Sequence, residues 1–320
     1  RAAAADPANP KAPPVPGWYR LTVGLSEPEP GDEGEPNDKP ELASRFLGDG
    51  RVLEAAGLFG WRRDEDMFRL PLAGLPDGAV LSVELEGVEG VTASLRVLDP
   101  VQKLLAQTQG RAGERLILRH LRIVGPPPST GVAPPLDESA FVVVRADRGT
   151  NLDTRYLLRA RVDVAEAGME VEPNDDVARA LPVQPGSVRG HLLPGDVDVY
   201  RIEVPGPTEL DLEVVPPERV DAKLEVLGPD GRVLAKADGG KRREPERLPN
   251  VFVESGHVFV RLTAGKGDGN PEETYELKLA GREGAPGAER EPNDTTATPL
   301  PVGVEGAGLL APKGDVDLWR

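Results

Sequence analysis

Two acidic patterns recur along this chain, and their residue types suit the binding of a calcium ion. Each copy of the first pattern, Glu-Pro-Asn-Asp, has a further Glu two residues before it. Each copy of the second pattern reads Asp-x-Asp-x-aromatic-Arg, where x is any residue. Side chains alternate along an extended segment, so the paired acidic residues of each pattern face the same way. The first pattern occupies residues 35–38, 172–175 and 291–294, and the second occupies 64–69, 196–201 and 315–320.

Calcium fits these residues because it takes about six to eight oxygen ligands in a flexible geometry. Carboxylates and an Asn carbonyl supply such ligands, and no His or Cys that would favour zinc is expected beside them. The alternative is structural, since Pro-Asn-Asp is a good turn and acidic residues often decorate a surface. The recurrence of both patterns, and of the extra Glu, favours the metal over that alternative.

The same spacing divides the chain into domain-sized repeats. The first pattern begins at positions 35, 172 and 291, which are 137 and 119 residues apart, and Tyr19, Tyr156 and Tyr275 recur at the same two intervals. A repeat of this length is an array of domains rather than a solenoid. Short acidic linkers containing Gly and Pro separate the units. The expected divisions are 1–26 as the tail of a truncated repeat, 33–163 and 170–281 as whole repeats, and 289–320 as the start of another.

Each repeat is expected to be an antiparallel β-sandwich, because short strands alternate with turn residues. Gly228-Pro229-Asp230-Gly231 is predicted to be a hairpin turn. Val101–Gln109 is assigned as a strand, and the Pro-rich stretch Gly125–Pro135 as an insertion that lengthens the first repeat. A role for that stretch as a polyproline ligand remains an alternative. The strands expected in the second repeat are Val188–Leu193, Val197–Val204, Leu210–Val215, Lys223–Leu227, Arg232–Ala235, Asn250–Val253, His257–Leu262 and Tyr275–Leu279.

Composition narrows the class of protein. The chain has 320 residues and a net charge of −16, which argues against nucleic-acid binding, since phosphates are bound by clustered Lys and Arg. No Cys is present, which excludes disulfides and Cys-ligated metals. No apolar run approaches the ~18 residues of a membrane span. The chain begins at Arg1 rather than Met, so we expect a fragment, and a signal peptide is left open.

The pairing of Glu-Pro-Asn-Asp with a later Gly-Asp-x-Asp-x-aromatic resembles the bacterial pre-peptidase C-terminal domain family, in tandem copies. It is also similar to the collagen-binding domains of clostridial collagenases. The resemblance implies a jelly-roll-like fold and Ca²⁺ as the bound ion, which pins each linker to its domain. Arg63 departs from the pattern, since Gly precedes the Asp pair in the other copies, and this departure could weaken binding there. The implied ligands are Glu33, Glu35, Asn37, Asp38, Asp64 and Asp66; Glu170, Glu172, Asn174, Asp175, Asp196 and Asp198; and Glu289, Glu291, Asn293, Asp294, Asp315 and Asp317.

Catalysis is not expected within this chain. His120, His191 and His257 stand at different places in their repeats, without a matching nucleophile or metal partner. Nucleophile-elbow and zinc-peptidase motifs are missing, although a glycosidase carboxylate pair is left open. The recurring aromatics Phe68, Tyr200 and Trp319 fit core packing better than a ligand platform, and collagen binding is not carried over.

Two functions follow from this sequence. The first is a non-catalytic, calcium-stabilised array that acts as a spacer, adhesion or binding module of a secreted, periplasmic or cell-surface bacterial protein. The second is the accessory region of a secreted peptidase whose catalytic domain lies outside this sequence. An extracellular protein or polysaccharide is the expected kind of partner, and its identity, the parent protein and the oligomeric state are left open.

Overall fold

The computed structural model describes residues 31–123, 139–284, 287–294 and 297–320. Within these ranges the chain is all-β and forms nineteen strands and no helix. The expected tail 1–26, Tyr19 and the Pro-rich insertion lie outside the described residues. No helix able to cross a membrane is found in the part of the chain described here.

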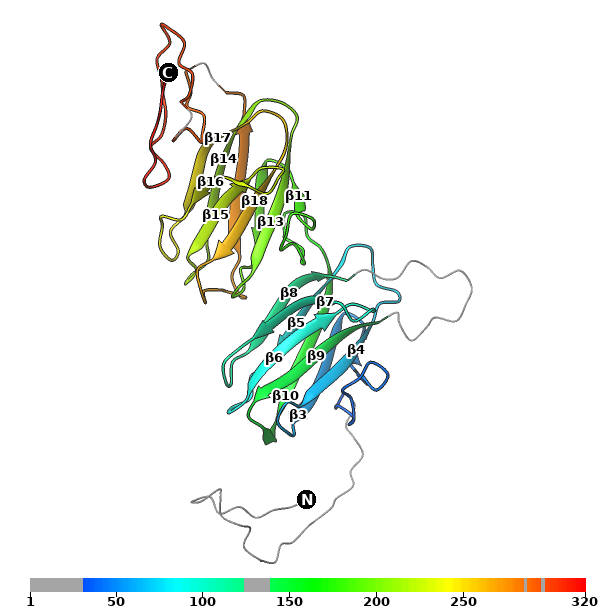
Figure 1. Cartoon of the computed structure of the whole chain (residues 1–320). Helices are drawn as coiled ribbons and strands as arrows, with labels where there is room; N and C mark the ends of the chain where they lie inside the picture. Colours follow the sequence, from blue (N-terminus) through cyan, green and yellow to red (C-terminus); the bar gives the residue numbers. More distant parts are fainter. Residues whose placement is uncertain (1–30, 124–138, 285–286, 295–296) are drawn as a thin grey trace, which may run out of the picture. The chain divides into compact units, whose positions relative to one another are not determined.

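The first sandwich is built from two five-stranded sheets, visible as two layers in Figure 1. One sheet has the order β1-β4-β9-β6-β7 and the other β2-β3-β10-β5-β8. Apart from the parallel pair β1 and β4, the neighbours are antiparallel. The strands are β1 Ser44–Arg45, β2 Leu47–Gly48, β3 Val52–Phe59, β4 Glu65–Pro71, β5 Ala79–Leu85, β6 Thr92–Leu98, β7 Leu104–Gln109, β8 Leu116–Arg122, β9 Ser139–Arg148 and β10 Asn151–Val164.

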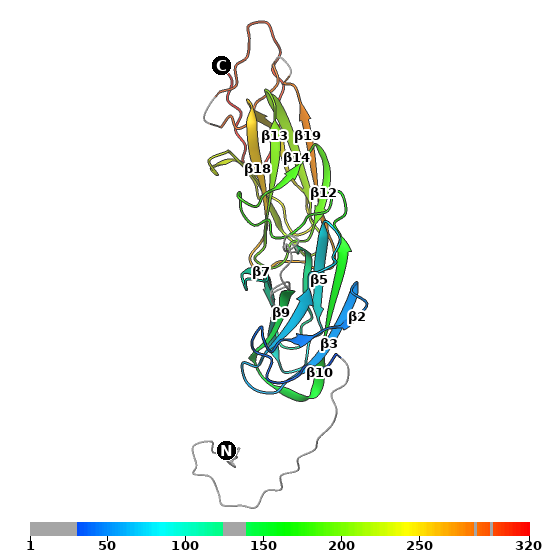
Figure 2. The ribbon, with the colours of Figure 1, turned by 90° about the vertical axis from the view of Figure 1, so that its right-hand side faces the viewer.

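The second sandwich repeats this arrangement with the sheets β11-β13-β18-β15-β16 and β12-β19-β14-β17. Figure 2 shows β13 and β18 in one layer and β12, β14 and β19 in the other. The strands are β11 Leu181–Val183, β12 Gly186–Gly190, β13 Val197–Val204, β14 Thr208–Val215, β15 Ala222–Leu227, β16 Val233–Ala237, β17 Glu246–Val253, β18 Gly256–Ala264 and β19 Tyr275–Arg282.

Each sandwich encloses its own core of Val, Leu and Ala side chains. The alternation of buried and more exposed residues is regular in β6, as expected for a strand with one face on the core. Phe68, Tyr156, Tyr200 and Tyr275 are fully buried. The expectation that the aromatics pack inside is therefore confirmed for Phe68 and Tyr200, while Trp319 is half-buried.

The eight strands expected in the second repeat are all present, with shifted ends. The expected strand Val188–Leu193 is wrong in its second half, because β12 ends at Gly190. There the backbone N–H of His191 donates to the Glu170 carboxylate at 2.6 Å instead of to a neighbouring strand. The turn at Gly228–Gly231 is confirmed, since the Gly231 N–H donates to the Gly228 carbonyl at 2.9 Å and Gly231 has a φ of 77°. The short strand β11 was not foreseen.

Candidate metal centres

The three Glu-Pro-Asn-Asp segments adopt one local structure. The Glu-Pro peptide bond is cis in each. The backbone N–H of the Asn donates to the carboxylate of the Glu two residues earlier, at 3.1 Å for Asn37, 2.7 Å for Asn174 and 2.9 Å for Asn293. All three Asn residues are fully buried. The Asn therefore lies inside the fold rather than in a solvated turn.

Backbone hydrogen bonds bring the second acidic pattern against the first. The Asn174 carbonyl accepts from Val199 N–H at 3.0 Å, and the Asn37 carbonyl accepts from Met67 N–H at 3.1 Å. These bonds place the Asp pair at the start of β13 or β4 beside the glutamates. Each repeat thus brings its two acidic patterns together in one acidic cluster. The first cluster is Glu33, Glu35, Asp64 and Asp66; the second is Glu170, Glu172, Asp196 and Asp198; the third is Glu289, Glu291, Asp315 and Asp317.

Close approach of ligand atoms is found within each cluster. One carboxylate oxygen from each member of a group lies within 4.8 Å of those of the other members, a spacing that could hold a metal ion. The groups with this property are Glu35, Asp64 and Asp66; Glu170, Glu172 and Asp198; and Glu289, Glu291, Asp315 and Asp317.

The fourth residue of the motif takes no part in these groups. Asp38, Asp175 and Asp294 are exposed, and Asp175 forms an ion pair of 2.9 Å with Arg179. As candidate ligands they are the weakest members of the predicted set.

A glycine that the sequence analysis missed makes room for the outermost Glu of each cluster. A Cβ placed on Gly190 would overlap the Glu170 carboxylate and the Tyr275 hydroxyl. Gly57 stands in the same relation to Glu33 and Tyr156. The residue after each glycine then donates its N–H to that Glu, at 2.8 Å from Leu58, 2.6 Å from His191 and 2.6 Å from Leu309. The recurrence of Gly at this place is visible in the sequence and could have been noticed.

The recurring tyrosines also reach the clusters. The Tyr275 hydroxyl donates to Glu170 at 2.9 Å and contacts the Tyr200 hydroxyl. The Tyr156 hydroxyl donates to Asp66 at 2.7 Å and lies 3.0 Å from Glu33. Each tyrosine is anchored in the last strand of its sandwich, so the core positions the hydroxyl.

Burial dominates the electrostatics of the second cluster. Desolvation, together with the neighbouring carboxylates, raises the pKa of Glu172 to about 9 and that of Glu170 to about 8. Desolvation also raises the pKa of Asp196 to about 6 and holds that of Asp198 well above its usual range. The cause is the cost of placing several like charges where water cannot reach them.

In the first and third clusters, the pKa values of most carboxyl groups are also raised. Burial raises the pKa of Asp66 to about 8, and it also raises the pKa values of Glu35 and Asp64. In the third cluster, desolvation raises the pKa of Glu291 to about 8. A hydrogen bond with Glu289 raises the pKa of Asp317 to about 6.

The Glu of the second and third motifs is hydrogen-bonded to the preceding repeat. Glu172 forms an isolated parallel bridge with Leu121 of β8, through Glu172 N–H to the His120 carbonyl (3.0 Å) and Arg122 N–H to the Glu172 carbonyl (2.6 Å). Glu291 repeats this pattern on β17, with bonds of 2.9 and 2.8 Å. The motif therefore lies between one repeat's strand and the next repeat's acidic cluster.

The expectation that no His lies near the acidic residues is wrong. His191 is buried beside Glu170, and its Nδ1 lies 3.9 Å from Glu170 Oε1. The His120 ring lies 5.4 Å from that of His191, centroid to centroid. The sequence separated the two histidines by 71 positions, and the pairing of Glu172 with β8 brings them together.

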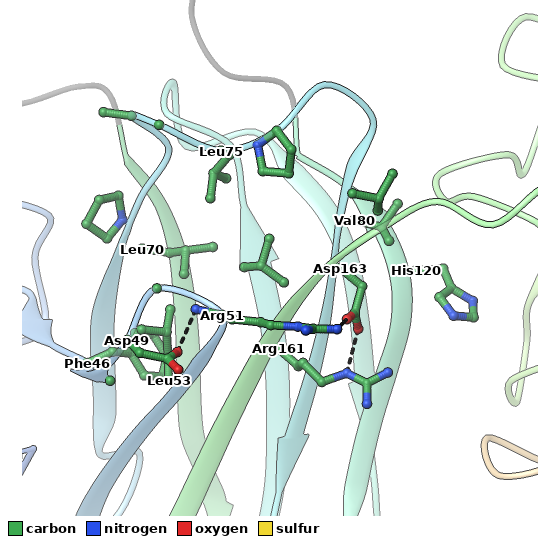
Figure 3. A pocket seen from close by; sticks show the side chains of 18 of the residues that line it. Phe46, Asp49, Arg51, Leu53, Leu70, Leu75, Val80, His120, Arg161 and Asp163 are labelled. Atoms are coloured by element: carbon green, nitrogen blue, oxygen red, sulfur yellow. Dashed lines mark hydrogen bonds and ion pairs between the residues drawn. The ribbon is translucent and has the colours of Figure 1, made fainter.

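A large open pocket lies on the first sandwich, with a volume of about 1060 Å³. Figure 3 shows charged residues of the pocket paired with one another: Asp163 accepts a hydrogen bond from Arg51 at 3.3 Å and forms an ion pair with Arg161 at 2.5 Å. His120 lies at its margin, apart from these ion pairs. The acidic clusters do not line this pocket, so it is separate from the candidate metal centres.

No protein-family model matches the chain, and no curated protein matches it. Among solved structures, the chain is similar to the pre-peptidase C-terminal domain of a collagenase from Bacillus anthracis. The identity is 18% over 34% of this chain and 97% of that chain, with a TM-score of 0.27.

Two other solved structures are similar to larger parts of the chain. One is the CUB1-EGF-CUB2 domain of human MASP-1/3, with 12% identity, 72% of this chain and 100% of that chain covered, and a TM-score of 0.21. The other is the CBM22-1-CBM22-2 tandem domain of Xyn10C from Paenibacillus barcinonensis. The identity is 8%, the match covers 72% of this chain and 87% of that chain, and the TM-score is 0.19. At such identities and TM-scores these likenesses settle neither ligand nor function, and the fold class rests on the strands and sheets described above.

Proposed function

We propose that this chain is a non-catalytic array of calcium-stabilised β-sandwich domains, serving as a spacer or binding module of a secreted or cell-surface protein. The observation that carries the proposal is the burial of Glu170 and Asp198, which are 1% and 0% exposed. Among the described residues, no Lys or Arg lies within ion-pair distance of either carboxylate. Buried carboxylates without a cation are costly, and a divalent ion would remove that cost.

The chemistry of the second cluster supports calcium as the ion. Glu170, Glu172, Asp196 and Asp198 supply carboxylate oxygens only, which hard cations such as calcium prefer. Asp198 Oδ2 is buried without a hydrogen-bond partner in the described structure. With its amide oriented to satisfy its hydrogen bonds, Asn174 donates from its side-chain nitrogen to Asp198 Oδ1 at 3.1 Å and to the Val197 carbonyl at 3.3 Å. The unpaired buried oxygens Asp66 Oδ1 and Asp317 Oδ1 extend the argument to the other clusters.

Calcium would act on the connection between repeats. Glu172 has its backbone bonded to β8 and its carboxylate in the second cluster, so an ion bound there would hold the connecting segment to both. A ligand at a thousand times its Kd stabilises the folded state by about 4 kcal/mol. Millimolar extracellular calcium and a micromolar Kd would meet that condition. Bound calcium would thus stiffen the connection between repeats, and the array would act as a rigid spacer.

The alternative function is the accessory region of a secreted peptidase. It is favoured by the pairing of Glu-Pro-Asn-Asp with a later Asp pair, which resembles pre-peptidase C-terminal domains. The sequence of the whole parent protein would decide between the two, since a peptidase signature elsewhere in it would support the accessory role.

Calorimetric titration of the chelator-treated 320-residue chain with calcium tests the proposal. We expect micromolar binding and a higher melting temperature in calcium than in chelator. Asp198→Asn keeps the shape of the side chain and removes its charge, so this variant should lose calcium binding at the second cluster. Glu254→Gln, at an exposed carboxyl, is the matched control and should bind as the unaltered chain does. No calcium binding by the unaltered chain would overturn the proposal.

A further inference from the structure

We propose that His120, His191 and Glu170 form a site for a transition-metal ion of the Zn²⁺ class. His120 comes from β8, His191 directly follows β12, and Glu170 belongs to the segment that connects the two sandwiches. One ligand atom of each residue lies within 4.8 Å of those of the other two. This site differs from the acidic clusters in its chemistry, because imidazole nitrogens favour zinc and similar ions over calcium.

The distances are close to those that a zinc ion requires. Zinc bonds of about 2.0–2.1 Å in tetrahedral geometry separate ligand atoms by about 3.3 Å. His191 Nδ1 and Glu170 Oε1 are 3.9 Å apart, and the two imidazole rings are tilted by 48°. The ligand atoms of all three residues must therefore approach one another by up to about 1.5 Å to reach coordination distance. Two His, one Glu and a water molecule would complete four ligands.

Unpaired nitrogens at the site are an independent reason to expect a ligand. His191 is only 7% exposed, and its Nδ1 has no hydrogen-bond partner among the described residues. The Nδ1 of His120 is likewise buried and unpartnered in the described structure. Leaving such a buried atom unsatisfied is unfavourable. A metal ion would satisfy these nitrogens together.

Hydrogen bonds hold the three residues in place and leave the Nδ1 atoms of both histidines free. His120 donates its N–H to Ser82 Oγ at 3.4 Å and accepts from Glu172 N–H at 3.0 Å through its carbonyl. His191 donates its N–H to Glu170 Oε1 at 2.6 Å. The second oxygen of Glu170 accepts from the Tyr275 hydroxyl. Supports of this kind orient ligands and raise metal affinity.

The chain contains a matched junction that lacks the site. Around Glu291, Asn250 takes the place of His120, and Leu309 takes the place of His191. The backbone bonds are the same, and both His120 and Asn250 have positive φ values, 48° and 57°. There the Asn250 side chain donates to Glu289 at 3.2 Å. The two imidazoles are therefore not needed for the junction itself, which is consistent with an added metal at one junction only.

The test uses the whole chain, first stripped of metal with a chelator and then kept in saturating calcium. It is titrated with Zn²⁺ by calorimetry and, separately, with Co²⁺ by absorbance. We expect one tight Zn²⁺ site and the ligand-field bands of four-coordinate Co²⁺. His191→Leu and His120→Asn copy the other junction and should each weaken Zn²⁺ binding at least about 100-fold, more than typical losses from supporting residues. His257→Asn, at the remaining His, is the control and should bind as the unaltered chain does.

Melting curves with and without Zn²⁺ keep the test decisive. Zn²⁺ should raise the melting temperature of the unaltered chain and of His257→Asn, and of neither junction variant. If His191→Leu fails to fold, the partly exposed His120→Asn variant decides the outcome. Absence of Zn²⁺ binding by the unaltered chain, or equal affinity in His120→Asn, would overturn the proposal. If the unaltered chain binds Zn²⁺ but not calcium, the zinc proposal stands and the calcium proposal is overturned.

Discussion

The first and second acidic clusters are made from the same motif, yet they differ in burial. The Glu35 side chain is exposed, whereas Glu172 is largely enclosed. Burial raises the pKa of both, but only that of Glu172 reaches about 9. Equal sequence motifs therefore provide unequal electrostatic environments.

The neighbouring strand accounts for this difference. The backbone of Glu172 is paired with Leu121 and Arg122 on β8. No such pairing is found for Glu35 among the described residues. Enclosure excludes water, so it raises the cost of ionised carboxylates and the gain from a bound cation alike. In an array of this kind, we expect the strand of the preceding repeat to influence how deeply the next acidic cluster is buried.

The largest expected effect is that of pH on the calcium-free chain. Glu170 and Glu172 have folded pKa values of about 8 and 9, above the ordinary value of 4.5, so the folded state holds protons that the unfolded state releases. Their contribution to stability is fully present below pH 4.5 and is lost as the pH rises through 8 to 9. Each proton held changes the unfolding free energy by about 1.4 kcal/mol per pH unit.

Melting curves in chelator from pH 5 to pH 9 measure this dependence. Calcium should flatten it, because the ion replaces the protons, and calorimetry in buffers of different ionisation enthalpy should show proton release on calcium binding. A melting temperature in chelator that rises with pH would contradict the assignment of protonated carboxyls.

The next largest effect is expected from Gly190→Ala. The added methyl group would overlap the Glu170 carboxylate and the Tyr275 hydroxyl, so we expect a loss of about 1–3 kcal/mol in unfolding free energy and weaker calcium binding. Gly57→Ala should act in the same way on the first cluster. Gly206→Ala is the control, because a Cβ there meets no atom within 4 Å. Chemical denaturation measures all three, and equal stability of Gly190→Ala and Gly206→Ala would contradict the geometry.

A smaller effect separates the two clusters directly. Glu172→Gln removes the need to keep a buried carboxyl protonated, so the calcium-free chain at pH 8 should gain on the order of 1 kcal/mol. Glu35→Gln should gain less, because that side chain is exposed. Both variants should weaken calcium binding. Denaturation in chelator provides the measurement, and a larger gain from Glu35→Gln would reverse the comparison between the clusters.

The smallest effect concerns the residue before the Asp pair. Arg63 has a φ of 65°, while Gly195 and Gly314 at the same place have φ values of 85° and 92°. Glycine adopts this conformation at no steric cost, so Arg63→Gly should change the stability by less than about 1 kcal/mol. We expect the calcium affinity of the first cluster to stay nearly unchanged. A large rise in affinity would show instead that the charge of Arg63 opposes the metal.

Local chemistry in the sequence was enough to predict the strands and to single out the recurring acidic residues as candidate ligands. Alternation along β13 and the turn at Gly228–Gly231 depend on neighbours in the chain, and both were correctly placed. The ends of β12 and β17 were not, because they depend on bonds to residues far away in the sequence. The role of Gly190 was also hidden, since it depends on the space that Glu170 and Tyr275 occupy.

The recurring acidic patterns specify which oxygens each repeat offers, because residue type and two-residue alternation are local properties. Sheet pairing alone decides how deeply those oxygens are buried, which tyrosine hydroxyl meets them and which repeat covers them. His120 and His191 illustrate the point, because 71 positions separate them and only the bridge between Glu172 and Leu121 places them together. Contacts of that range come from the packing of whole strands, which no short stretch of the chain encodes.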